Sequence, residues 1–439
     1  MNKAILVIFM KTYNNLFEHI ISFNNLYSAY KKASYGKRYR MDVLLFSKNL
    51  EENLINIQKQ LMSKTWIPKP FRCFYVYDPK KREIHAPEFD DRIVHHALCN
   101  IIEPLFERKF IYDSYACRKR KGIHLAVKRV QQNIFINDYV LKADISKYFP
   151  SINHDVLLSI IKKTVSCKDT IWFIETIIKS HKNGLPIGAL TSQLFANVYL
   201  DQLDHYIKDY LGVKRYFRYM DDIIILHPNK KYLGELLKAI QHYLFSKLCL
   251  VLNNKTSIFP ARHGIDFCGY RIWKTHIKLR KRNIKKTKRK FKKYVRLYKA
   301  NKINFSRIYA SFMSFLGYAK HSNNLNAIIS IISILIGGST TQIKNLINRP
   351  SADILYKNFV NSQNSIAYNR QNKRVNQYHK ILSLICNLLS FICNTSIIFY
   401  AICLKCGTYH DRDINASVNL MLYGIKQVGM EQPEYWKKK

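Results

Sequence analysis

The chain has 439 residues, enough for two or three domains with a buried core, so a disordered chain and a disulfide-stapled miniprotein are both excluded. Its 72 Lys and Arg against 29 Asp and Glu give a formal net charge of +43, which predicts a polyanionic partner, nucleic acid before an anionic membrane surface. The Cys residues are scattered singly except for one C-x-x-C pair, a usage typical of a reducing compartment. We therefore expect a cytoplasmic protein.

Two apolar segments raise the question of a leader or a membrane span. Ala4–Met10 follows a single Lys and lacks a small-residue cleavage site, so we do not expect secretion. Ile381–Cys403 carries no charge and is long enough to cross a bilayer, but it contains six Ser, Asn and Thr side chains that would be costly in lipid. We expect a buried helix or a pair of strands there, and no membrane partner.

The predicted elements alternate between helices and strands. Apolar spacing indicates helices over residues 12–65, a hairpin with a basic tip over 71–85, and then a helix over 92–106. After these come a strand over 139–145, helices over 153–163 and 192–210, and a strand, turn and strand over 216–226. This order places Asp144 and the pair Asp221-Asp222 on strands that could be neighbours in one sheet.

The adjacent carboxylates need a physical reason in a chain so poor in acid. Asp221 and Asp222 lie at the tip of an apolar hairpin, where like charges repel unless a cation neutralises them. Mg²⁺ prefers oxygen ligands, and Asp144 could supply a third carboxylate. Two such ions would activate a primer 3′-hydroxyl and stabilise the leaving pyrophosphate. The alternative is an ordinary turn, because Asp favours turns.

Five motifs in order make the first interpretation stronger. Tyr219-Met-Asp-Asp222 is the YMDD box of reverse transcriptases, and the other four motifs resemble that family in the expected order. They are Asp144–Phe149, Gly184–Gln193, Leu252–Thr256 and Phe267–Tyr270. The resemblance implies an α+β right-hand polymerase with fingers, palm and thumb, a ferredoxin-like antiparallel palm sheet, and RNA-directed DNA polymerase activity.

The same resemblance implies roles for single residues. Asp144, Asp221, Asp222 and the carbonyl of Ile145 would hold two Mg²⁺ ions, with Mn²⁺ as a substitute, and Lys255 would protonate the pyrophosphate. Phe149 would exclude a ribose 2′-hydroxyl, so we predict deoxynucleotide use. The nucleotide-binding candidates are Lys81, Arg82, Arg118, Phe149, Ile187, Gly188 and Gln193, with Arg92 as a further cation. The primer-grip candidates are Phe267, Cys268, Gly269 and Tyr270.

One departure from most relatives points to a subgroup. Ile187 stands before Gly188 where Gln is usual, and with Ser192-Gln193 this pattern is similar to the reverse transcriptases of diversity-generating retroelements, which copy a template RNA into cDNA with errors at adenines. A branched apolar side chain removes an amide hydrogen bond near the nascent base pair, which would loosen base selection. Implied partners are a template RNA, a primer–template duplex, deoxynucleoside triphosphates and a small basic accessory protein. The likeness covers residues 12–325, with Arg120 where Gly is commoner.

A basic segment follows the motifs. Arg271–Lys299 holds 15 Lys and Arg and no acid, with aromatic residues interleaved, which predicts a folded helix along a nucleic-acid backbone rather than a disordered tail. We assign it to the thumb. The predicted domains are N-terminal helices and fingers over 1–135, palm over 136–275, basic thumb over 276–325, and an appended segment over 326–439, where the composition shifts to Ile, Ser and Asn.

The appended segment ends in a short likeness of its own. Cys403–Leu420 is similar to the C-terminal end of TnpB-type proteins, in which a zinc ribbon precedes a catalytic Asp of a RuvC-like nuclease. Cys403 and Cys406 are candidate zinc ligands, and His410 could add a third, whereas structural zinc needs four. We therefore expect neither zinc nor nuclease activity here. A remnant of gene fusion or a partner-binding tail is the simpler interpretation.

Two other readings of the whole chain stay open. The polymerase could belong to a group II intron, a retron or a defence system, although Ile187 and Gln193 argue against this. A protein of another class, a basic RNA-binding protein without catalytic activity, would also explain the charge. Retention of Lys255 and all three Asp residues argues against it.

Overall fold

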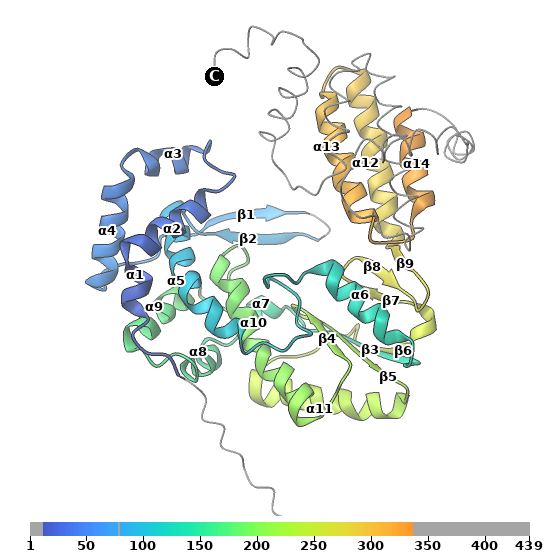
Figure 1. The fold of residues 1–439 in the computed structure, drawn as a ribbon, viewed down its shortest axis with the longest axis horizontal. Coiled ribbons are helices and arrows are strands. Elements are labelled where there is room, and N and C mark those ends of the chain that lie inside the picture. The colour runs from blue at the N-terminus through green and yellow to red at the C-terminus, as the bar shows by residue number, and fades with distance from the viewer. Residues whose placement is uncertain (1–11, 78–79, 337–439) are drawn as a thin grey trace, which may run out of the picture. The chain divides into compact units, whose positions relative to one another are not determined.

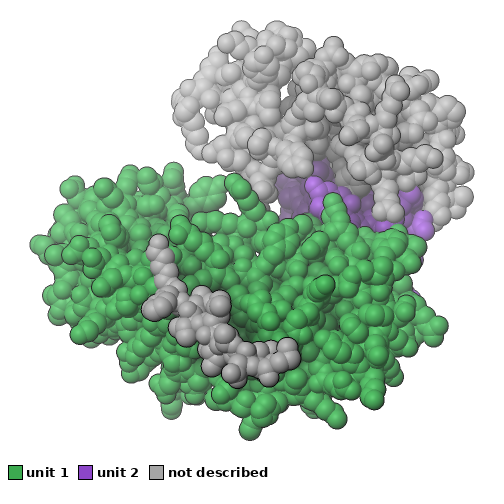
Figure 2. Space-filling model, turned by 60° about the horizontal axis from the view of Figure 1, so that its bottom comes forward, with its two compact units in different colours: residues 1–277 green, residues 278–439 purple. Residues whose placement is uncertain are grey.

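The computed structural model describes residues 12–77 and 80–336 of the chain (Figure 1). The segment Ile381–Cys403, the candidate zinc ligands Cys403 and Cys406, and the predicted turn at Asp78-Pro79 lie outside the described residues. The chain divides into two compact units, residues 1–277 and residues 278–439, coloured separately in Figure 2. In the described part of the chain, no helix combines the length and the apolar composition that crossing a membrane requires.

The N-terminal part of the first unit is helical, as predicted. Helix α5 (Phe89–Glu107) is packed against α2 (Phe23–Ser34), and α1 (Phe17–Ile21), α3 (Met41–Lys48) and α4 (Leu50–Met62) complete the group. The apolar residues at helical spacing are the ones that become buried: Ile20, Leu26 and Leu54 are each 0% exposed. Hydrophobic burial of one face of each helix therefore explains this layer.

The predicted basic hairpin is present beside these helices. Strand β1 (Arg72–Val76) pairs antiparallel with β2 (Arg82–Ala86), with Arg72 opposite Ala86 and Val76 opposite Arg82. Most of its side chains are exposed, so the hairpin presents its cations to solvent. Helix α6 (Ile123–Ile134) lies between this hairpin and the central sheet in sequence.

The central sheet of the first unit has four antiparallel strands in the order β4-β5-β3-β6. They are β3 (Tyr139–Asp144), β4 (Tyr216–Tyr219), β5 (Asp222–His227) and β6 (Ser257–Pro260). Between β3 and β4 come α7 (Tyr148–Ser151), α8 (His154–Lys162), α9 (Lys168–Lys179) and α10 (Leu190–His205), and a π-helical turn (Tyr206–Tyr210) extends α10. Helix α11 (Lys230–Leu248) packs against the sheet (Figure 1).

This strand and helix order confirms the predicted ferredoxin-like palm. A β-α-β-β-α-β chain whose strands pair in this order is the split βαβ arrangement. The strands form because they are short apolar runs: Ile223, Ile224 and Ile225 are all fully buried. Helix α10 is buried on nearly all sides, so it forms the interior of the unit rather than its surface. This is the arrangement expected for the palm of the predicted α+β right-hand polymerase fold.

A small hairpin ends the first unit. Strands β7 (Ile265–Phe267) and β8 (Tyr270–Ile272) pair antiparallel, and their two-residue turn has φ of 48° at Cys268 and 88° at Gly269. Two positive φ values are typical of a type I′ turn, which is the tightest hairpin connection. A 3-10 turn (Ala261–His263) precedes the hairpin, and β9 (Ile277–Leu279) follows it at the boundary between the units.

The described part of the second unit consists of three helices. The basic helix α12 (Lys281–Lys299) packs against α13 (Phe305–Ala319) and α14 (Leu325–Ile336). Its one buried side chain, Phe291, meets Phe312 edge to face at 6.0 Å between ring centroids. The predicted helix therefore forms. Because α14 begins at Leu325, helical structure continues beyond the predicted end of the thumb. The domain boundaries themselves stay predictions.

Candidate active site

The palm sheet brings the three predicted carboxylates together. Asp144 ends β3 and is the direct register partner of Asp222, which begins β5. Asp221 occupies the turn between β4 and β5. Side chains of directly opposite residues in an antiparallel pair stand about 5 Å apart at Cβ. The sequence-based expectation that these strands are neighbours is confirmed.

The electrostatics around Asp221 suit a bound cation. Burial raises the pKa of Asp221, and the nearby charge of Asp144 raises it further, while Arg82 and Arg218 act in the opposite direction. Within the described ranges, no three His, Cys, Asp or Glu side chains converge as a closed metal site. Mg²⁺ commonly takes one or two carboxylates and completes its shell with water and substrate phosphates, so an open set of carboxylate oxygens fits this ion.

The neighbours of Asp144 are positioned by a short bridge. Ile145 is 2% exposed and pairs antiparallel with Leu252 in an isolated bridge. The backbone N–H of Asn253 donates to the backbone carbonyl of Asp144 at 2.6 Å. The backbone N–H of Lys255 donates to the side-chain oxygen of Asn253 at 3.1 Å. Lys255 is exposed. The loop therefore places Lys255 two residues beyond a backbone contact with Asp144.

Sequence reasoning missed a buried arginine next to the catalytic turn. Arg218 and Asp204 are each 0% exposed in their side chains and form a two-point ion pair, with Nε to Oδ1 at 2.7 Å and Nη2 to Oδ2 at 2.5 Å. Nη1 of Arg218 donates to the carbonyl of Met220 at 3.1 Å. A charged residue inside an apolar strand was the signal that could have found it.

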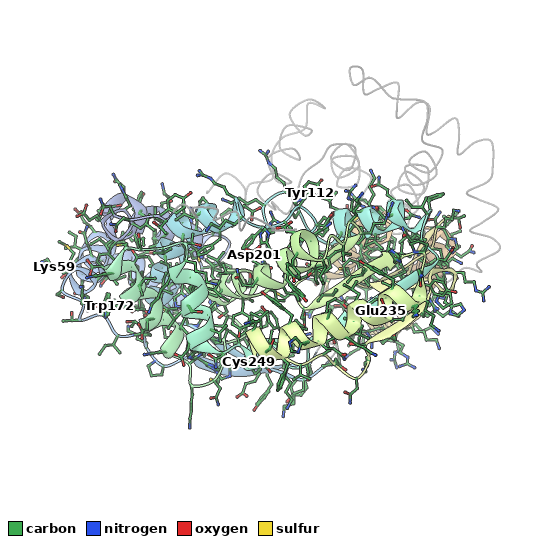
Figure 3. The ribbon with its side chains drawn as sticks, turned by 90° about the horizontal axis from the view of Figure 1, so that it is seen from below. Lys59, Tyr112, Trp172, Asp201, Glu235 and Cys249 are labelled. Atoms are coloured by element: carbon green, nitrogen blue, oxygen red, sulfur yellow. The ribbon has the colours of Figure 1, made fainter. Side chains whose placement is uncertain are left out.

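Helix α10 supplies the acceptors of this cluster. Asp204 also accepts from the Tyr216 hydroxyl at 2.5 Å, and Asn197, two turns earlier on the helix, accepts from Arg218 at 3.1 Å. Asp201 lies on the same helix, and Figure 3 labels it between Trp172 on α9 and Glu235 on α11. Burial, followed by the charge of Asp204, raises the pKa of Asp201 to about 7. The helix thus carries buried carboxylates into the interior of the palm.

A second cation that sequence reasoning missed lies on β3. Lys142 is two residues before Asp144, so both side chains project from one face of the strand. Its Nζ is 3.7 Å from Oδ1 of Asp222 and donates to the carbonyl of Asp266 at 2.5 Å. Lys142 therefore links a catalytic-site carboxylate to the β7–β8 hairpin. In that hairpin Phe267 and Tyr270 are fully buried, so the Cys268-Gly269 turn is what the primer-grip candidate presents.

The predicted motif Gly184–Gln193 contacts the predicted site residue Phe149 and the basic hairpin. The Leu185 amide donates to the carbonyl of Phe149 at 2.8 Å. The Ile187 carbonyl accepts from the His85 amide of β2 at 2.8 Å, so this motif is tied to the basic hairpin. A Cβ on Gly188 would lie 2.8 Å from the His85 carbonyl oxygen, which explains the glycine. Gln193 is an exposed side chain in the first turn of α10.

Replacing Gly184 by Ala should disrupt this closure. Gly184 has φ of +60°, and an added Cβ would lie 2.2 Å from the Phe149 carbonyl oxygen, so backbone must move. We expect a loss of about 2 kcal/mol or more in the free energy of unfolding, since strain and overpacking add. Denaturant unfolding measures it. The matched control is Gly234→Ala on α11, where a Cβ meets nothing within 4 Å and helix propensity predicts slight stabilisation. Equal stability of the two variants would contradict the described closure.

The predicted nucleotide-binding cations do not all reach the carboxylates. Arg82 lies on β2 and is close enough to lower the pKa of Asp221, and Lys81 precedes it with Nζ 4.2 Å from the Tyr75 ring centroid. Arg118 is held elsewhere: its side chain is 6% exposed, it pairs with Glu107 at 2.8 Å, and its Nη1 donates to two backbone carbonyls. This placement argues against the predicted triphosphate role of Arg118.

Arg92 takes part in a contact between two helices, and Arg120 lies in a turn. Nη2 of Arg92 donates to Asp42 at 2.8 Å, which joins α5 to α3. Arg120 adopts φ of 57°, in the left-handed region that glycine enters without cost. A turn therefore forms at this position with an arginine in the left-handed conformation.

Comparisons with known proteins follow the same part of the chain. Residues 67–272 match the family described as reverse transcriptase (RNA-dependent DNA polymerase). Protein YkfC of Escherichia coli is 25% identical over 268 residues, covering 49% of this chain and 70% of that protein. The group II intron-encoded protein LtrA of Lactococcus lactis is 26% identical over 230 residues, covering 48% of this chain and 38% of that protein. Apo telomerase from Candida tropicalis aligns with a TM-score of 0.41 and 12% identity, covering 76% of this chain and 69% of that one.

Proposed function

We propose that this chain copies a template RNA into cDNA as part of a diversity-generating retroelement. The match of residues 67–272 to the reverse transcriptase family supports the polymerase part of this proposal. The observation that best supports polymerase activity is the register of the palm sheet, which sets Asp144 opposite Asp222 with Asp221 in the adjoining turn. The proposed partners are a template RNA, a primer–template duplex, deoxynucleoside triphosphates and a small basic accessory protein, in the cytoplasm.

Each proposed role uses a residue whose position is described above. Asp144, Asp221, Asp222 and the carbonyl of Ile145 would hold two Mg²⁺ ions. Bound there, the ions would lower the pKa of the primer 3′-hydroxyl and offset charge on the phosphates. Arg82 and Lys81 would hold the triphosphate from the hairpin, Phe149 would lie against the sugar, and exposed Lys255 would give a proton to pyrophosphate. Arg118 would reach a nucleotide only after leaving its contacts with Glu107 and two backbone carbonyls.

The retroelement assignment rests on Ile187. The backbone carbonyl of Ile187 already accepts a hydrogen bond from the backbone N–H of His85. The Ile187 side chain makes only apolar contacts, whereas a Gln side chain at this position could both donate and accept hydrogen bonds. A base pair that lacks one polar restraint is selected less strictly. The second candidate is a group II intron enzyme, which the similarity to LtrA, named as a group II intron-encoded protein, favours. The error spectrum separates the two.

Replacing Ile187 by Gln should reduce errors. One added hydrogen bond of about 1 kcal/mol would lower misincorporation about fivefold. The measurement is sequencing of cDNA made by the full chain on a defined RNA template, with errors counted by template base. We expect wild-type errors to concentrate opposite adenines, and Ile187→Val, which keeps a branched aliphatic side chain, to leave that spectrum unchanged. Faithful wild-type cDNA would instead favour the intron candidate.

The basic helix α12 is suited to the backbone of a duplex. Five of its exposed cations recur every three or four residues and therefore form one stripe along the helix, at Arg282, Lys285, Arg289, Lys292 and Arg296. Such a row can neutralise successive phosphates without reading sequence. We propose that this stripe holds the primer–template duplex.

Primer–template binding should accordingly weaken steeply with salt. Between about 50 and 200 mM salt the dissociation constant should rise about 10³-fold, because bound counterions are released. Arg289→Gln with Lys292→Gln should reduce the slope of log affinity against log salt by about two. The control, Lys238→Gln with Lys247→Gln on α11, removes the same charge from exposed positions of another helix. Fluorescence anisotropy measures both, and an affinity indifferent to salt would refute the assignment.

A further inference from the structure

The ion pair of Arg218 with Asp204 lies in the interior of the palm, where burying charges costs free energy of folding. Both side chains are fully buried, and removing two charges from water carries a penalty that well-packed apolar residues would avoid. The neighbouring strand residues Phe217 and Ile223 are apolar and buried, so the site could be filled without charge. A contribution to stability is therefore a weak explanation for the pair.

The geometry of the Arg218 guanidinium offers a better explanation for the ion pair. Asp204 occupies Nε and Nη2, which fixes the plane of the group, and Asn197 holds Nη1 at 3.1 Å. The same Nη1 reaches the carbonyl of Met220 at 3.1 Å. That carbonyl belongs to the peptide that joins Met220 to Asp221. Helix α10 thus fixes the orientation of one peptide in the catalytic turn.

This peptide is in a conformation that needs support. Met220 has φ of 55°, in the left-handed region that residues with side chains rarely adopt. Such strain persists where the surroundings over-determine the backbone. A rotation of this peptide would displace Asp221 and, through it, the start of β5 at Asp222.

We propose that Arg218 is a positioning residue that sets the Met220–Asp221 peptide and thereby places the two adjacent carboxylates for divalent metal. This inference deepens the proposed function and rests on it. Asp204 acts only by aligning the Arg218 guanidinium. Neither residue touches substrate.

Two variants separate positioning from support of the fold. Arg218→Lys keeps a buried positive charge for Asp204 but cannot reach two acceptor groups in fork geometry. The double variant Asp204→Leu with Arg218→Met removes both charges together and leaves no unpaired ion, although the Tyr216 hydroxyl loses its acceptor. Its melting temperature should therefore fall less than that of Asp204→Leu alone. Leu54→Ala on α4, a buried site away from the palm, is the control for lost stability alone.

The primary measurement is Mn²⁺ affinity of the full chain by electron paramagnetic resonance, with single-turnover primer extension as the second. Both Arg218 variants should bind Mn²⁺ about tenfold or more weakly, as loss of a residue that orients metal ligands does. Extension should fall about 10²-fold, which a small misplacement of reacting groups can cause. Leu54→Ala should lower the melting temperature and leave Mn²⁺ affinity unchanged.

Wild-type Mn²⁺ affinity in Arg218→Lys, or recovery of affinity together with stability in the double variant, would overturn the proposal. If the double variant does not fold, Arg218→Lys decides alone. A wild-type chain that binds Mn²⁺ but extends no primer would refute the polymerase, while weaker Mn²⁺ binding in the variants would still support the positioning role.

Discussion

Replacing Asp221 and Asp222 together by Asn should abolish primer extension while leaving the fold intact. The proposed metal pair would supply several kcal/mol of transition-state stabilisation, and each 1.36 kcal/mol is tenfold in rate, so we expect a loss of at least about 10³-fold. The amides keep the shape of the carboxylates in a turn between paired strands. Single-turnover extension of a DNA primer on an RNA template measures the effect.

Stability and binding distinguish this loss from unfolding. Because burial and Asp144 raise the pKa of Asp221, its ionised form is disfavoured in the folded protein, and a neutral amide removes that cost. The melting temperature without metal should therefore not fall. Primer–template affinity should also hold. Asp155→Asn, at an exposed carboxylate in the first turn of α8, is the matched control and should extend as wild type does. Residual extension near the wild-type rate in the double variant would exclude these carboxylates from catalysis.

Replacing Phe149 by Ala should admit ribonucleotides. Phe149 lies in α7, five residues after Asp144, and is half-buried against Tyr148, with ring centroids 5.7 Å apart. Truncation removes the ring that is proposed to meet the ribose 2′-hydroxyl. We expect the ratio of kcat/KM for deoxynucleotides to kcat/KM for ribonucleotides to fall about 10²-fold. This is the factor by which a pocket typically distinguishes two substrates that differ by one small group.

A ring-preserving variant controls for packing. Phe149→Tyr keeps the aromatic body and should keep discrimination, whereas Phe149→Ala also loses contact with the core, which the melting temperature will report. If Phe149→Ala still rejects ribonucleotides while extending with deoxynucleotides, the proposed position of the sugar is incorrect.

The palm could be predicted from sequence because its signals are local. Strand β5 is an apolar run that begins at Asp222, and β3 is apolar apart from Lys142 and ends at Asp144. The two-residue turn between β4 and β5 allows only an antiparallel hairpin. The helix–strand alternation then restricts the topology to few choices. These constraints make β3 and β5 candidate neighbours, and the structure supplies the register that pairs Asp144 with Asp222.

The supporting residues could not be predicted for the opposite reason. Asp204 and Arg218 are 14 residues apart. The place of Arg218 in an apolar strand marks that residue alone, and nothing in the sequence identifies Asp204 as its partner. Lys142 is one of 72 Lys and Arg, and its position in the chain does not distinguish it from the others. Arg118 was a nucleotide-binding candidate, but its enclosure by Glu107 and two carbonyls depends on how a loop folds back on α5. Contacts between distant segments decide such roles, and one sequence does not display them.

The most direct test of the central claim is extension of a DNA primer on an RNA template by the purified full chain in Mg²⁺, with the proposed template RNA and accessory protein supplied. We predict a cDNA product that is lost when Asp221 and Asp222 are replaced. Tight, salt-dependent RNA binding without any extension under these conditions would contradict a polymerase and indicate a basic RNA-binding protein.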